Sequence, residues 1–343
     1  MSPTLPPSEA SLAGPTAQPL EPPTAQPPDR PNGPPNGPPT ATPAATSGAG
    51  RTAAWTTAAL LAFAGNSLLC RLALRDTGID ALSFTSLRLL AGALVLGLLV
   101  LWRHPAPVAP GASQRPARPW QGGEWPSALA LFAYAAGFSL AYVDLSAATG
   151  ALLLFGTVQT TMIGWGLWRG ERLAPPQWLG LAAASAGLVW LLMPGLAMPS
   201  PSAALLMASA GVAWAVYTLR GRGAGDATTV TAGNFLRTVP LAVVASLLGA
   251  VLIEAPRWDA TGAALALVSG AITSGLGYAA WYTALRGLSA TRAAILQLSV
   301  PGLAAVGGVL LLGEPLTGRL LGASVAVLGG VALVIRGRTP TAG

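Results

Sequence analysis

The chain is dominated by apolar stretches, each of roughly 18 to 25 residues, that recur from Arg51 almost to the C-terminus. An α-helix rises about 1.5 Å per residue, so each stretch is long enough to cross a hydrocarbon core of about 30 Å. The pattern predicts an all-α integral membrane protein with ten transmembrane helices. The predicted spans are residues 52–73, 80–102, 126–146, 149–168, 177–194, 202–220, 229–253, 261–285, 291–312 and 318–336.

The composition argues against a soluble domain. Of the 343 residues, 52% are hydrophobic and only 9% are charged, whereas soluble domains carry about 25% charged residues. The net charge of +7 comes from arginine, because the sequence has no lysine. These arginines stand singly between apolar stretches instead of clustering on one polar face, which argues against nucleic-acid binding.

Reactive side chains are too scarce for most enzymes. Cys70 and His104 are the only residues of their types, so they supply no disulfide, no metal cluster and no nucleophile with its base. Without lysine there is no Gly-x-x-x-x-Gly-Lys phosphate loop, which excludes ATP hydrolysis by this chain. We therefore expect no catalytic residue, no cofactor and no metal site.

The first 50 residues differ from the rest, because they hold 15 of the 31 prolines and few large apolar side chains. Such a segment buries too little apolar surface to offset its chain entropy, so residues 1–50 are predicted to form a disordered Pro-rich cytoplasmic tail. The segment lacks the basic start and apolar core of a signal peptide. It is read as a solvated extension, with a Pro-rich ligand for a partner as the alternative.

The distribution of arginine predicts the orientation. With the N-terminus inside, thirteen arginines fall in inner segments, and only Arg71, Arg75, Arg257 and Arg319 fall in outer ones. Because positively charged loops stay in the cytoplasm, both termini are predicted to be cytoplasmic.

The two halves of the chain resemble each other. Gly170-Glu171-Arg172-Leu173 recurs 143 positions later as Gly313-Glu314-Pro315-Leu316, and the segments that end at Arg88 and Arg237 are also similar. Residues 51–195 and 202–337 would then form two repeats of five helices each. An odd number of helices makes the second repeat enter the membrane from the opposite side, so the repeats are predicted to be inverted.

These features resemble the EamA-domain transporters of the drug/metabolite transporter (DMT) superfamily. The resemblance rests on the ten-span pattern, the arginine in helices two and seven, and the Gly-Glu-x-Leu turn after helices four and nine. Gly65-Asn66 in the first helix and Ile79-Asp80 before the second are similar to that family as well. The resemblance implies a ten-helix bundle that moves small metabolites or drugs by alternating access without ATP.

The predicted function is therefore a secondary transporter, expected to act in efflux across a bacterial inner membrane. The expected partners are a small-molecule substrate of unspecified class and the lipid bilayer, and the protein is expected to be a monomer or a homodimer. The alternative is a membrane sensor or assembly protein that keeps the carrier fold without transport.

Polar and aromatic side chains deep in the spans are the candidates for substrate contact, because they are costly in lipid and usually face the bundle interior. The alternative reading is interhelical hydrogen bonding by the amides and packing by the rings. Tyr134, Phe138 and Tyr217 are weaker candidates. The main candidates are Asn66, Gln159, Trp214, Tyr278, Trp281 and Gln297.

Five charged residues in or near the predicted spans have roles to be weighed. Arg88 and Arg237 lie within predicted spans, where they could attract an anionic substrate group or act as gates; capping of backbone carbonyls is the favoured alternative. Glu171 and Glu314 lie shortly before predicted helices, and their carboxylates are expected to cap and stabilise the N-termini of those helices. Asp144 is the one plausible proton-binding carboxylate near a span interior.

Overall fold

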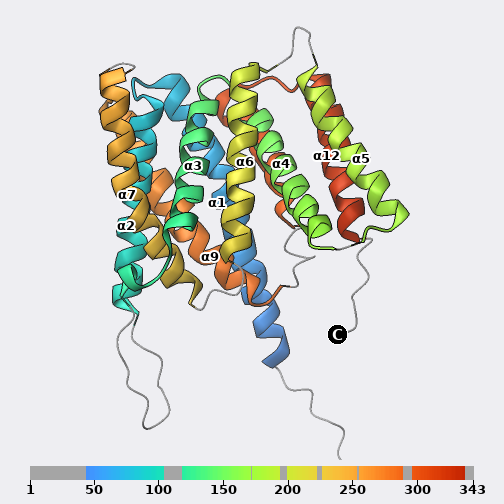
Figure 1. Ribbon diagram of the computed structural model, residues 1–343, viewed down its shortest axis with the longest axis horizontal. Helices are drawn as coiled ribbons and strands as arrows, with labels where there is room; N and C mark the ends of the chain where they lie inside the picture. The colour runs from blue at the N-terminus through green and yellow to red at the C-terminus, as the bar shows by residue number, and fades with distance from the viewer. Residues whose placement is uncertain are drawn as a thin grey trace, which may run out of the picture. The chain divides into compact units, whose positions relative to one another are not determined.

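The computed structural model in Figure 1 describes residues 44–103, 118–170, 172–193, 199–221, 226–252, 255–288 and 296–336. This part of the chain is all-helical, as predicted, and contains no strand. The prediction for the tail falls mostly outside it, although the first helix already begins at Ala44. The elements are α1 (Ala44–Asp76), α2 (Ala81–Trp102), η1 (Pro119–Gln121), α3 (Trp125–Tyr142), α4 (Ala147–Trp168), α5 (Pro175–Leu192), α6 (Pro201–Gly221), α7 (Ala227–Leu252), α8 (Ala260–Val268), η2 (Ser269–Leu276), α9 (Gly277–Leu285), α11 (Ser299–Leu312) and α12 (Gly318–Arg336).

The helices begin and end at residues with clear physical roles. The Asp80 side chain accepts from the first amides of α2, and Ser146 and Asp259 do the same for α4 and α8. At the other end of a helix, Gly313 adopts a φ of 63° and stops α11. Glycine adopts this left-handed conformation without a side-chain clash.

Six helices are long and apolar enough to cross a membrane, and they lie at residues 50–76, 81–102, 147–168, 201–221, 228–252 and 260–285. The sixth combines α8, η2 and α9. The helices α3 and α5 have 18 residues each and are not among these six. Two shorter apolar helices lie at 299–312 and 318–334. Counting α8, η2 and α9 as one and leaving out the short η1, the described ranges contain ten helical segments, of which six meet the length and composition of a membrane span.

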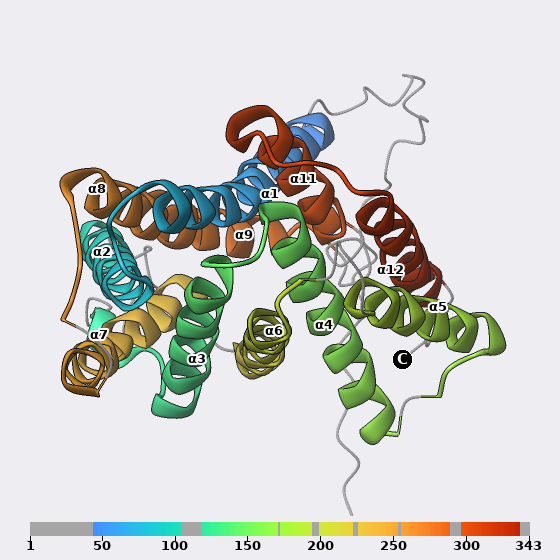
Figure 2. The same cartoon turned by 90° about the horizontal axis from the view of Figure 1, so that it is seen from above.

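Helices from the two halves pack against each other in pairs. Figure 1 shows α2 beside α7 and α5 beside α12, and Figure 2 shows α3, α6 and α4 in a row with α1 and α9 facing them. The α2–α7 pair is antiparallel: the backbone amide of Arg257, just after α7, donates to Asp80, whereas Arg103 at the end of α2 pairs with Asp226 at the start of α7.

Glycine permits the closest helix contacts. A Cβ on Gly270 would clash with the carbonyl oxygen of Arg88, and a Cβ on Gly330 would clash with the carbonyl oxygen of Gly180. The η2 and α2 backbones, and likewise those of α12 and α5, can approach this closely because these positions lack a side chain.

Candidate functional site

A small chamber lined by buried residues lies among helices of both halves of the chain. It holds about 20 Å³ of free space, which is close to the room that one water molecule needs. Five elements contribute to its wall: α1, α3, α4, α6 and α9. The lining residues are Phe63, Asn66, Ser67, Tyr134, Phe138, Leu154, Phe155, Trp214 and Tyr278.

Aromatic rings form most of this wall. The ring centroids of Tyr134 and Trp214 are 4.7 Å apart, and those of Trp214 and Tyr278 are 5.1 Å apart. Phe63 meets Tyr278 edge-on at 5.9 Å, and Phe138 lies 5.4 Å from Tyr134. The tilted and edge-on geometries are those that aromatic pairs prefer, so the wall is a connected cluster of rings from four helices.

Asn66 is the polar centre of the chamber. Its Oδ1 accepts hydrogen bonds from Ser269 Oγ at 2.8 Å and from Thr273 Oγ1 at 3.2 Å, and its Nδ2 donates to the Tyr134 hydroxyl at 3.4 Å. Ser269 and Thr273 belong to η2, which is a π-helix. Such segments are rare and frequently mark functional positions. The π-helix thus places two hydroxyls where they fix the amide of Asn66.

Arg88 lies next to the chamber, in contact with two of its rings. The guanidinium carbon is 5.1 Å from the ring centroid of Phe138 and 5.9 Å from that of Tyr134. The residue is 1% exposed, and its Nη2 donates to the carbonyl oxygen of Ala135 at 2.9 Å. Its Nη1 has no hydrogen-bond partner. Among the buried side-chain nitrogen and oxygen atoms of the described ranges, it is the one atom without such a partner.

This arrangement of Arg88 is energetically unfavourable. Burying an unpaired ion destabilises the folded protein by several kcal/mol. A desolvated cation–π contact offsets about 2 kcal/mol of this. A group that satisfied Nη1 and neutralised the charge would therefore bind here with a strong electrostatic gain.

Arg237, the counterpart of Arg88 in the second half, has a different environment. Its Nη1 donates to the carbonyl oxygens of Gly122 and Gly233, and its Nη2 lies 3.4 Å from the carbonyl oxygen of Trp120. These bonds tie α7 to the turn around η1 and match the carbonyl-capping alternative. Arg237 is not among the residues that line the chamber.

The remaining candidates lie at different distances from the chamber. Asn66, Trp214 and Tyr278 line it, and Trp281 contacts the lining residue Phe63 with a centroid distance of 5.6 Å. Gln159 is buried in α4 but is not a lining residue. Gln297 is half-buried just before α11 and next to Leu298, which packs with Ala184 and Val331 in a separate small cluster.

Glu314 joins the two halves of the chain at the end of the bundle where α1 ends. Its Oε1 lies 3.2 Å from Arg71 Nε, and its Oε2 accepts from the backbone amide of Ala147, the first residue of α4. Glu314 therefore stabilises a helix N-terminus, but that of α4 and not that of the following helix. Its counterpart Glu171 lies outside the described residues, and Asp144 is exposed.

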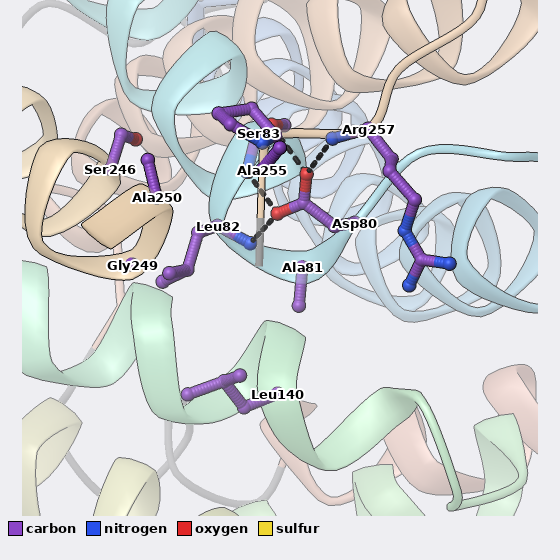
Figure 3. A pocket seen from close by; sticks show the side chains of 11 residues that line it. Asp80, Ala81, Leu82, Ser83, Leu140, Ser246, Gly249, Ala250, Ala255 and Arg257 are labelled. Atoms are coloured by element: carbon purple, nitrogen blue, oxygen red, sulfur yellow. Dashed lines mark hydrogen bonds between the residues drawn. The ribbon is translucent and has the colours of Figure 1, made fainter. Parts of the chain in front are cut away.

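A second cavity, of about 150 Å³, lies where α2 begins and α7 ends (Figure 3). The Asp80 carboxylate on its wall already accepts from the amides of Leu82, Ser83 and Arg257 and from the Ser83 hydroxyl. Although burial opposes this, hydrogen bonds from Ser83, Arg257 and Leu82 hold the pKa of Asp80 below its ordinary value. This carboxylate is committed to the local fold, so the smaller aromatic chamber is the better candidate site.

Sequence reasoning missed four lining residues: Phe63, Ser67, Leu154 and Phe155. They stand in uniformly apolar or small-residue surroundings, so nothing in their type distinguishes them. One available signal was spacing, because Phe63 precedes Asn66 by three residues and so lies on the same helix face.

The chain matches one family model and several curated proteins. The EamA-like transporter family model matches residues 201–336. The chain is 56% identical over 288 residues to the uncharacterized protein PA1977 of Pseudomonas aeruginosa, covering 84% of this chain and 96% of that protein. It is 31% identical over 160 residues to the threonine/homoserine exporter RhtA from two strains of Salmonella typhimurium. The aligned region covers 45% of this chain and about half (52%) of the length of RhtA.

A solved crystal structure of another protein shares the fold. That structure has a TM-score of 0.56 and 21% sequence identity, and the match covers 84% of this chain and 98% of the other chain.

Proposed function

This chain belongs to the EamA-like transporter family of the DMT superfamily, and on that basis we propose that it is a secondary transporter that exports small metabolites by alternating access without ATP. The observation that carries the proposal is the aromatic chamber around Asn66, which helices from both halves of the chain enclose. An enclosed site with a few fixed polar groups in an apolar wall is typical of small-molecule binding.

The packing of the helices supports two inverted repeats, α1–α5 and α6–α12. In this arrangement α1 corresponds to α6, α2 to α7, α3 to the α8–η2–α9 segment, α4 to α11 and α5 to α12. The α2–α7, α4–α11 and α5–α12 contacts then join corresponding helices, and the α3–α6 contact corresponds to the contact between α1 and the α8–η2–α9 segment. Contacts that persist under this exchange are expected from a two-fold relation between repeats. In such transporters the substrate site lies near the membrane midplane, between the repeats.

The small chamber volume supports a conformational cycle. About 20 Å³ holds one water molecule, so a metabolite enters only when the surrounding helices separate. Ion pairs between the two halves of the chain lie at both ends of the bundle: Arg71 with Glu314 at one end, and Arg103 with Asp226 at the other. Opening one end at a time would give the chamber alternating access to the two sides of the membrane.

The orientation follows from the arginine distribution. We place the protein in a bacterial inner membrane with both termini in the cytoplasm, so Arg71 and Glu314 lie at the outer end. In Figure 1, α1 begins and α12 ends at the same end of the bundle, as expected if the two termini lie on one side of the membrane. One copy of the chain has enough helices to enclose a pathway, and a homodimer is compatible with it.

The RhtA relatives suggest the first substrates to test, which are threonine and homoserine. The purified protein would be reconstituted into liposomes loaded with one unlabelled compound, and counterflow of the labelled compound would be measured. We expect counterflow by the wild type and at least about tenfold less by Trp214→Ala, which removes a chamber wall. Trp165→Ala is the control, because Trp165 is exposed on α4.

The outcomes separate transport from its alternative. Equal counterflow by Trp214→Ala and Trp165→Ala would show that the chamber is not the substrate site. Binding without any counterflow of a broad metabolite panel would favour the membrane sensor or assembly protein.

A further inference from the structure

We propose that Arg88 binds the carboxylate of the transported substrate through its Nη1 atom. The substrate class is then small monocarboxylates with an apolar body, including α-amino acids. This inference rests on the proposed function, because it takes the aromatic chamber as the substrate site.

The first argument is the missing counter-ion. In the described part of the chain, ion pairs form at Arg71, Arg75, Arg103 and Arg220, and Arg88 takes part in none of them. The Nη1 atom of Arg88 is buried without a hydrogen-bond partner. A bound anion would therefore complete this site. Guanidinium groups match carboxylates in planarity and form strong charge-assisted hydrogen bonds with them.

The second argument is position. Tyr134 and Phe138 contact the guanidinium and also line the chamber. A ligand in the chamber is thus separated from Arg88 by these two rings, and movement of the rings brings its anionic group to Nη1. The same opening is needed to admit the ligand, because the closed chamber holds only about 20 Å³.

The third argument concerns the rest of the ligand. No residue that lines the chamber is charged, so a single positive charge from Arg88 matches a monoanion better than a phosphate dianion. The faces of Trp214, Tyr278 and Phe63 accommodate an apolar body, and aromatic faces also attract an ammonium group. An α-amino acid presents all of these groups.

The experiment compares each acid with its amide, which has nearly the same shape without the charge. The full chain in detergent is titrated with L-threonine, L-leucine and L-phenylalanine and with the three corresponding amides, and dissociation constants are taken from the ligand-dependent rise in melting temperature. The proteins are the wild type, Arg88→Gln and Arg237→Gln. The last is the matched control, because Arg237 donates to the backbone carbonyl oxygens of Gly122, Gly233 and Trp120 and does not line the chamber.

We expect the wild type to bind at least one acid about tenfold to a hundredfold more tightly than its amide, as for a lost hydrogen bond to a charged group. Arg88→Gln should bind that acid and its amide equally, and Arg237→Gln should keep the preference. Equal binding of acids and amides by the wild type, or a full preference in Arg88→Gln, would overturn the inference. If Arg88→Gln does not fold, equal binding of acids and amides by the wild type would still overturn the inference.

The same compounds separate this inference from the proposed function. Counterflow of amides as fast as acids would overturn the role of Arg88 and leave transport standing. If the wild type neither binds nor moves any compound of either series, both the inference and the transport of this substrate class are wrong.

Discussion

The Nε atom of Arg71 lies 3.2 Å from Oε1 of Glu314, so one ion pair joins the first helix to the turn between α11 and α12. Arg71 also donates to the carbonyl oxygens of Tyr142 and Val143, and Glu314 accepts from the amide of Ala147. The pair therefore connects α1, the α3–α4 turn and the α11–α12 turn at one end of the bundle.

Replacing Glu314 with alanine should destabilise this end. The change leaves a largely buried arginine without its counter-ion and the first amide of α4 without an acceptor, and breaking a buried pair costs about 3 kcal/mol. We expect a clearly lower melting temperature in detergent. Asp144→Asn is the control, because it removes an exposed carboxylate next to the same turn. Equal melting temperatures for the two variants would contradict this role of Glu314.

Asp80→Asn should show a pH-dependent loss of stability. The pKa of Asp80 is lowered in the folded protein, so its contribution is present above the ordinary value of 3.8 and is lost as the pH falls through the folded value. The melting temperature of the variant should be below that of the wild type at pH 7, and the difference should shrink near pH 3. A difference that stays constant over this range would show that ionisation of Asp80 contributes nothing.

Gly270→Val should disrupt the contact between η2 and α2. A side chain there collides with the carbonyl oxygen of Arg88, so either the helices separate or the protein fails to fold. A shift of α2 also moves Arg88, so weaker substrate binding should accompany the lower stability. Gly302→Ala is the control, because nothing lies within 4 Å of its added Cβ, and it should melt at or slightly above the wild-type temperature. A fully stable Gly270→Val variant would be inconsistent with the close helix contact.

The predicted orientation can be tested with a reporter that is active only in the periplasm. Fused after Gly343, the reporter should stay inactive, whereas fused after Ala255, in the connection between α7 and α8, it should be active. The opposite pattern would invert the proposed topology.

The sequence predicts the fold class and several chamber residues because their signals are local. Asn66 stands out as an amide in an apolar helix, and Trp214 and Tyr278 as large rings among small residues. The sequence does not distinguish the faces of helices that are apolar all round, which is why Gln159 and Gln297 looked equivalent to Asn66 although the structure places neither in the wall.

Other features depend on contacts between segments that are distant in sequence. Arg88 and Arg237 occupy similar positions in the two halves, yet one meets aromatic rings and the other meets the turn around η1. The π-helical geometry of η2 is also not evident from its residues, because it arises where Ser269 and Thr273 bond to Asn66.

Cysteine labelling tests most directly whether the chamber opens to bind substrate. In a Cys70→Ala background, Ser67→Cys places a thiol in the chamber wall, and Ser139→Cys places one in the buried core outside that wall. A membrane-permeant maleimide should label Ser67→Cys in the folded protein, L-threonine or another transported compound should slow the labelling, and Ser139→Cys should react only after denaturation. If Ser67→Cys is as unreactive as Ser139→Cys, the chamber is sealed and transport through it is contradicted.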